Sequence, residues 1–136
     1  MWHAYRDGAP IVVVTLHGPG SKSIPIPALV DSGADAALFH VQLAETVFGL
    51  RRSRAVRSSS DGIGPDPLPV WTWASASWHL EFGGHRFRIS PEFADLTGPN
   101  LLGRWDFFAQ FRVAFDEPGQ RVHISRDHAQ PWPPQE

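Results

Sequence analysis

Ala28-Leu29-Val30-Asp31-Ser32-Gly33-Ala34 is the stretch of sequence that decides the fold. An apolar run predicts a buried strand that ends at an acidic residue, and a rigid strand end holds a carboxylate in a fixed place. A small hydroxyl can then bond neighbouring backbone, and glycine lets the chain turn without placing a Cβ in a cleft. Because Asp-Ser-Gly also occurs as an ordinary turn, the surrounding sequence has to decide between the two interpretations.

The residues before this stretch predict a β-hairpin. β-branched residues run from Ile11 to Leu16, and a turn-rich segment follows from His17 to Ser23. Proline removes a ladder hydrogen bond, so Pro25 and Pro27 predict that only Ala28 to Val30 pairs as a central strand.

The residues after it predict one helix and then more strands. Apolar positions from Val41 to Phe48 recur at helical spacing, and Gly49 stands where a helix cap is expected. The polar stretch 51–67 predicts a mobile loop. Strict alternation from Val70 to Phe82 predicts one long half-buried strand, and Gly83-Gly84 turns it into a second strand, His85 to Ile89.

The last third of the chain contains a second motif. Asn100-Leu101-Leu102-Gly103-Arg104 is followed by a helical pattern in which Phe107, Phe108 and Phe111 share one face. A final hairpin is predicted from Arg112 to Asp116 and from Arg121 to Ser125. Residues 126–136 are polar and proline-rich, which is typical of a tail.

Taken in order, these motifs resemble the retropepsin-like aspartic proteases. The matching parts are Leu29 to Ala34, Val41 to Phe48, Asp61-Gly62-Ile63-Gly64 and Leu101 to Phe111, and the resemblance covers about Ile11 to Ile124. It implies an all-β, retropepsin-like acid-protease fold: a closed small β-barrel or sandwich with a flap hairpin and one or two short helices. We expect a single domain over 1–136, with its core at about 11–124 and the tail at 126–136.

The resemblance implies an aspartic endopeptidase that hydrolyses peptide bonds in extended polypeptide segments. Such hydrolysis uses two carboxylates that share a proton, so the pair titrates as a unit and activity tends toward acid pH. The sequence contains one Asp-Ser-Gly, because Asp7-Gly8 and Asp61-Gly62 lack the serine and the preceding apolar strand. The second catalytic aspartate is therefore expected to be Asp31 of another copy, in a two-fold homodimer. No cofactor is expected.

Supporting roles follow from the same resemblance. Ser32, Gly33 and Ala34 form the active-site loop, in which Ser32 bonds across the dimer axis and the Gly33 carbonyl faces a bound peptide. Asp61, Gly62, Ile63 and Gly64 form a flap that closes over substrate. Leu102, Gly103 and Arg104 support the loop, and Arg104 pairs with Asp35. The alternative for that pair is two solvated surface charges, which contribute little.

The sequence departs from the family pattern at several positions. Serine replaces the commoner threonine at Ser32, and Trp105 separates Arg104 from Asp106, which leaves the helix register open. Pro65-Asp66-Pro67 stiffens one side of the flap, and the proline-rich tail disfavours interleaved terminal strands. These departures keep an alternative open: a non-catalytic peptide-binding or oligomerisation module on the same fold.

Composition excludes several other classes of protein. The chain has 136 residues, no cysteine and a net charge of −2, so thiolate chemistry is absent and no general field attracts nucleic acid or an anionic membrane. We expect neither as a partner. The seven histidines lack metal-binding spacing, so no metal is expected. The start has no signal-peptide pattern and the longest apolar run, Ile11 to Val14, is too short to span a membrane, so a cytoplasmic location is expected.

Two aromatic residues on the predicted long strand have two possible roles. Trp71 and Trp73 lie on its otherwise polar face. They could line a peptide groove or a dimer contact, and core packing of at least one is equally compatible with the pattern.

Overall fold

The protein is built almost entirely from short strands. A computed structural model describes residues 1–60 and 66–126, and confirms the predicted all-β class. The strands are β1 (Trp2–Ala4), β2 (Ile11–Gly18), β3 (Lys22–Val30), β4 (Leu38–His40), β5 (Val56–Ser60), β6 (Leu68–Thr72), β7 (Trp78–Phe82), β8 (His85–Ile89), β9 (Glu92–Ala94), β10 (Asn100–Leu102), β11 (Arg112–Asp116) and β12 (Arg121–Ser125). The short helices are η1 (Pro19–Ser21), η2 (Leu43–Val47), η3 (Arg52–Arg54) and η4 (Arg104–Phe108).

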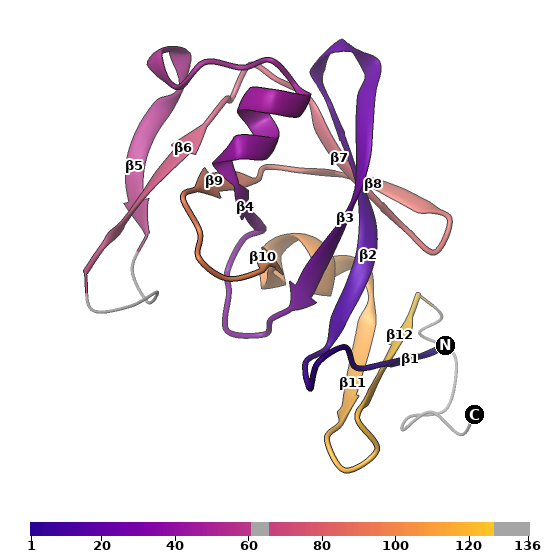
Figure 1. The fold of residues 1–136 in the computed structure, drawn as a ribbon. Coiled ribbons are helices and arrows are strands. Elements are labelled where there is room, and N and C mark those ends of the chain that lie inside the picture. Colours follow the sequence, from indigo (N-terminus) through magenta and orange to yellow (C-terminus); the bar gives the residue numbers. More distant parts are fainter. Residues whose placement is uncertain (61–65, 127–136) are drawn as a thin grey trace.

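The strands form two sheets (Figure 1). The larger sheet has nine strands in the order β5-β6-β9-β4-β10-β3-β2-β7-β8, and the smaller has three in the order β1-β12-β11. Within the described residues, β5 and β8 are the edges of the large sheet and do not pair with each other. The sheet is therefore open, and the expected closed barrel is absent from that part of the chain.

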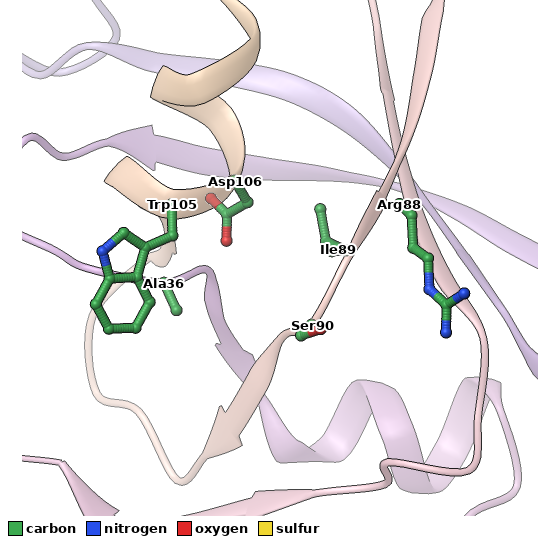
Figure 2. A pocket seen from close by; sticks show the side chains of 6 residues that line it. All are labelled: Ala36, Arg88, Ile89, Ser90, Trp105 and Asp106. Carbon is green, nitrogen blue, oxygen red and sulfur yellow. The ribbon is translucent and has the colours of Figure 1, made fainter.

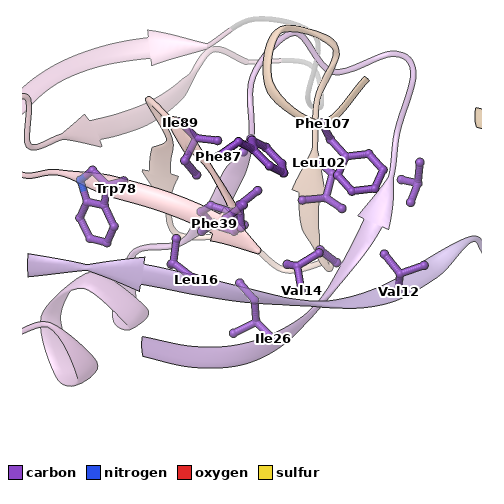
Figure 3. Close-up of a cluster of buried hydrophobic side chains, with 14 of the residues drawn as sticks. Val12, Val14, Leu16, Ile26, Phe39, Trp78, Phe87, Ile89, Leu102 and Phe107 are labelled. Atoms are coloured by element: carbon purple, nitrogen blue, oxygen red, sulfur yellow. The ribbon is translucent and has the colours of Figure 1, made fainter. Parts of the chain in front are cut away.

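The core lies against the long β2–β3 hairpin. Alternate residues of β2 (Val12, Val14 and Leu16) are buried, as the period of two along a strand requires. They pack in one cluster with aromatic residues from distant strands and from η4, which Figure 3 shows around Phe39 and Phe107. Burying each such side chain contributes roughly 1.5–3 kcal/mol, so this cluster is the main source of stability.

The prediction that Pro25 and Pro27 confine central pairing to Ala28 to Val30 is confirmed, although the strand itself begins earlier, at Lys22. The whole of β3 pairs with β2, with Pro25 opposite Thr15 and Pro27 opposite Val13. On its other side β3 pairs with β10 only from Ala28 onward. Both prolines therefore lie where β3 has one free edge, and a missing N–H leaves no gap in a ladder there.

The prediction of a mobile loop over 51–67 is partly wrong. Within 51–67 the chain forms η3 and β5, and β5 pairs antiparallel with β6 from Val56 opposite Thr72 to Ser60 opposite Leu68. Cross-strand pairing, which a single strand's sequence does not reveal, organises this polar segment.

The predicted long strand from Val70 to Phe82 is in fact two strands, β6 and β7. A turn separates them, with the Ala76 N–H donating to the Trp73 carbonyl at 3.0 Å. Trp73 is buried in the core, and its indole N–H donates to the Arg51 carbonyl at 3.1 Å. Trp73 therefore packs in the core. Trp71 is half-buried, and the guanidinium carbon of Arg52 lies over its indole, 4.8 Å from the ring centroid.

The remaining predicted elements are close to those observed. η2 lies inside the predicted helix, and Gly49 follows it with a φ of +68°, the left-handed conformation of a C-terminal cap. η4 overlaps the predicted aromatic helix, and β11 and β12 have the predicted bounds.

Candidate active site

Asp31 lies at the end of β3, beside the end of β10. These strands are parallel neighbours, with Val30 opposite Leu102. The Asp31 N–H donates to the Leu102 carbonyl at 3.2 Å and extends the pairing by one step. Since parallel strands end at the same edge of a sheet, the two sequence motifs emerge side by side.

The turn after Asp31 holds its carboxylate. The Gly33 N–H donates to Asp31 Oδ1 at 2.8 Å, and the Ala34 N–H donates to the Asp31 carbonyl at 3.2 Å. A Cβ on Gly33 would lie 3.2 Å from the same Oδ1 atom, which is closer than most real contacts. The turn thus presents a half-buried carboxylate in a fixed orientation, with Ser32 and Gly33 exposed around it.

Main-chain hydrogen bonds brace this loop against the start of η4. The Arg104 N–H donates to the Ala34 carbonyl at 2.9 Å, and the Trp105 N–H donates to the Asp35 carbonyl at 2.8 Å. The expected Arg104–Asp35 ion pair has its closest atoms, Nη1 and Oδ1, 4.0 Å apart, and the side chains are 62% and 63% exposed. An ion pair this exposed contributes little, so the backbone carries the support.

Gly103 allows the close approach on which those hydrogen bonds depend. A Cβ at this position would lie 2.6–2.8 Å from backbone atoms of Ala36. Backbone cannot move aside as a flexible side chain can, so any larger residue would push β10 away from the loop.

Asp106 is a supporting residue that the sequence analysis did not identify. It is buried, and its carboxylate accepts from the Ala37 N–H at 2.5 Å, the Gly103 N–H at 3.0 Å and the Phe107 N–H at 2.7 Å. Burial raises the pKa of Asp106, while these hydrogen bonds act in the opposite direction. Trp105 therefore does not disturb the helix start, because an acidic side chain three residues after Gly103 caps it. That spacing was the signal available in the sequence.

Asp31 opens onto a cavity of about 440 Å³. Residues from five separate segments line it, among them Asp31, Asp35, Ser59, Ser60, Glu92 and Trp105. Partial burial, and next the charge of Asp35, raise the pKa of Glu92. A neighbouring cavity of about 450 Å³ lies between Trp105, Asp106 and Arg88 (Figure 2). Trp105 lines both cavities and is 73% exposed.

The structure brings most of the predicted site residues together. Asp31, Gly33, Ala34 and Asp35 line one cavity, and Leu102, Gly103 and Arg104 lie beside their loop. The predicted flap residues, Asp61, Gly62, Ile63 and Gly64, lie outside the described residues. The strands on either side, β5 and β6, are paired, and Ser59 and Ser60 of β5 line the cavity that contains Asp31.

Two further features of residues 1–60 and 66–126 bear on function. Those residues contain no helix long and apolar enough to cross a membrane. They also place no three histidine, aspartate or glutamate side chains in a group that could hold a metal ion.

The fold has a counterpart among solved structures. It is similar to the EIAV protease complexed with the inhibitor HBY-793, with a TM-score of 0.52, 18% sequence identity, and coverage of 71% of this chain and 82% of that chain. The chain has a retropepsin-like fold. At this identity the likeness concerns the fold alone. No protein-family model and no curated protein matches the sequence.

Proposed function

We propose that the protein is an aspartic endopeptidase that hydrolyses peptide bonds in extended polypeptide segments. The observation that carries the proposal is the position of Asp31: a hydrogen-bonded turn at a strand end presents its carboxylate on a cavity wall. The same fold occurs in a retroviral protease. Catalytic groups need such rigid placement, and cavities of a few hundred Å³ suit bound side chains.

The proposed chemistry needs a second carboxylate, which a second copy of the chain supplies. One aspartate takes a proton from water, and the other polarises the substrate carbonyl and carries the shared proton. The Gly33 N–H fixes Asp31 Oδ1, so the carboxylate keeps its orientation as the proton moves. Since two adjacent like charges cannot both ionise at low cost, we expect an acidic pH optimum.

Substitution of Asp31 tests the proposal. Asp31→Asn keeps the size of the side chain but removes the proton acceptor, so cleavage of an unfolded, alkylated protein should fall by about 10³-fold. Peptide products are measured by mass spectrometry from pH 3 to 7. Asp66→Asn is the matched control, because Asp66 is exposed and does not line the cavity. Cleavage that persists in Asp31→Asn would contradict the proposal.

A second candidate is a non-catalytic peptide-binding module, and one observation favours it. β1 pairs with β12 of the same chain, and β11 occupies the other side of β12. Within the described residues, β12 therefore has no open edge for a strand of a second copy. This candidate predicts saturable binding of extended peptides without turnover, and retained binding in Asp31→Asn.

A further inference from the structure

We propose that the cavity beside Asp31 selects a lysine or arginine side chain of the substrate, and that Glu92 is the residue that makes this selection. The inference rests on the proposed peptidase function and adds a substrate class to it. It depends on the shape and lining of the cavity, and on the place of Glu92 in the sheet.

The floor of the cavity crosses three neighbouring strands. Leu101 of β10 lies opposite Leu38 of β4, and Leu38 lies opposite Glu92 of β9. Residues directly opposite one another share a face of the sheet, so these three side chains form one row. The row begins apolar, beside the strand that carries Asp31, and ends at a carboxylate. A long aliphatic side chain with a terminal cation matches that order.

The acidic end of the cavity has an unmatched charge. Within residues 1–60 and 66–126, no hydrogen bond or ion pair reaches the Glu92 carboxylate, and it lies close enough to Asp35 for that charge to act on it. The Arg104 guanidinium lies 4.0 Å from the Asp35 carboxylate and offsets part of its charge, but among the described residues no arginine or lysine lines the cavity. A substrate cation would supply the missing positive charge in a partly desolvated place, where charge pairs are stronger than in water.

Trp105 forms an exposed wall of the same cavity. A tryptophan that is 73% exposed offers a broad apolar face to the stem of a lysine or arginine side chain, and a π-face to its cation. Neutral or acidic substrate side chains would gain less, because they leave Glu92 unpaired or repel it.

Strand spacing gives the distance from the scissile bond. β3, β10, β4 and β9 are consecutive neighbours, so Glu92 lies on the order of 14 Å from the strand that carries Asp31. A lysine side chain spans part of that distance. The selected residue should therefore lie about two or three positions from the cleaved bond.

A cleavage profile followed by matched peptides tests the inference. The purified full chain digests an unfolded, alkylated protein near pH 7, because Glu92, whose pKa is raised, loses its charge toward acid pH. Mass spectrometry then locates the cleaved bonds. Lysine and arginine should be enriched at one fixed position near those bonds. In a peptide cleaved at such a site, replacing that lysine by norleucine should lower kcat/KM about tenfold, the effect of one partly exposed charge pair.

Variants then assign the preference to Glu92. Glu92→Gln should reduce the ratio of kcat/KM between the lysine and norleucine peptides to about twofold. Glu81→Gln on β7, outside the cavity, should leave this ratio at the wild-type value. The inference would be overturned if lysine and arginine were not enriched near the cleaved bonds, or if the lysine-to-norleucine ratio of kcat/KM were unchanged in Glu92→Gln. In either case the observed cleavage would still support the proposed peptidase function. If the wild-type chain cleaves nothing, the proposed function fails and the inference fails with it.

Discussion

At the scale of single residues, the least visible member of the site is Asp106. Its carboxylate joins the loop at Ala37, the end of β10 at Gly103 and the first turn of η4. One acidic side chain thus fixes the three segments whose relative positions set the orientation of Asp31. Such a residue does not touch substrate, yet the geometry of the site depends on it.

Asp106→Asn should destabilise the fold by about 1–3 kcal/mol. An amide has one acceptor oxygen, so its N–H₂ group would face one of the buried backbone N–H donors and leave that donor unsatisfied. Urea denaturation followed by tryptophan fluorescence measures the change. Asp66→Asn, at an exposed position, should leave the denaturation midpoint unchanged. An equally stable Asp106→Asn protein would show that the three hydrogen bonds do not brace the loop.

The sequence allowed the residues around Asp31 to be predicted, but not Glu92. Asp31, Gly33, Ala34 and Asp35 are close in sequence, and a strand followed by a turn is a local pattern. Glu92 reaches the same cavity only because β9 pairs in parallel with β4. A single sequence does not state which strands become neighbours, so a cavity residue from a distant strand stays hidden.

At the scale of secondary-structure elements, local turns were easier to predict than interruptions. The structure has the predicted turn at Gly83-Gly84, and β8, β11 and β12 have the predicted bounds. The break between β6 and β7 had no such marker, because the alternation of side chains continues through Trp73. Burial of the Trp73 indole and its bond to Arg51 decide the turn, and both are tertiary interactions.

The small sheet offers a pH-dependent test at this scale. Just beyond β1, the Tyr5 hydroxyl donates to Glu117 at 2.7 Å in the turn between β11 and β12. Partial burial, together with this hydrogen bond and the charges of Glu117 and Asp116, raises the pKa of Tyr5 to about 12. Because the pKa of Tyr5 is higher in the folded protein, the stabilisation from the Tyr5–Glu117 hydrogen bond is fully present below pH 10, the ordinary pKa of tyrosine. It is lost as pH rises through about 12.

Tyr5 is the chain's only tyrosine, so the ultraviolet absorbance of tyrosinate reports this one group. Its titration midpoint should lie near pH 12 in the wild type. Glu117→Gln removes a negative charge and should move the midpoint down toward the ordinary value, while Glu45→Gln on η2 should not. Circular dichroism at the same pH verifies that the sheet is intact. A wild-type midpoint close to pH 10 would contradict the hydrogen bond between Tyr5 and Glu117.

At the scale of the whole molecule, the described residues share a large hydrophobic core, but the sequence carries one Asp-Ser-Gly motif. The proposed catalyst therefore consists of two chains that each contribute Asp31. The smaller sheet already joins β1 to β12 within one chain, so the proposed dimer must use other surfaces than the edges of β12.

Mixing two kinds of chain tests this shared site. A tenfold excess of Asp31→Asn chains, allowed to exchange with the wild type, should lower peptidase activity to about one tenth, because most wild-type chains then have an inactive partner. The same excess of Asp66→Asn chains, in which Asp31 is intact, should raise activity. Activity that is indifferent to added Asp31→Asn chains would indicate a site complete within one chain.

The pairing of β1 with β12 also has a consequence for the order of folding. Trp2 lies opposite His123 in that pairing, so the contact closes a loop of almost the whole described chain. Long loops carry a high entropic cost and tend to close late. During synthesis, β1 emerges well before β12 and lacks its partner strand until β12 has left the ribosome. The small sheet is thus completed only after the large sheet's strands are already available to pair.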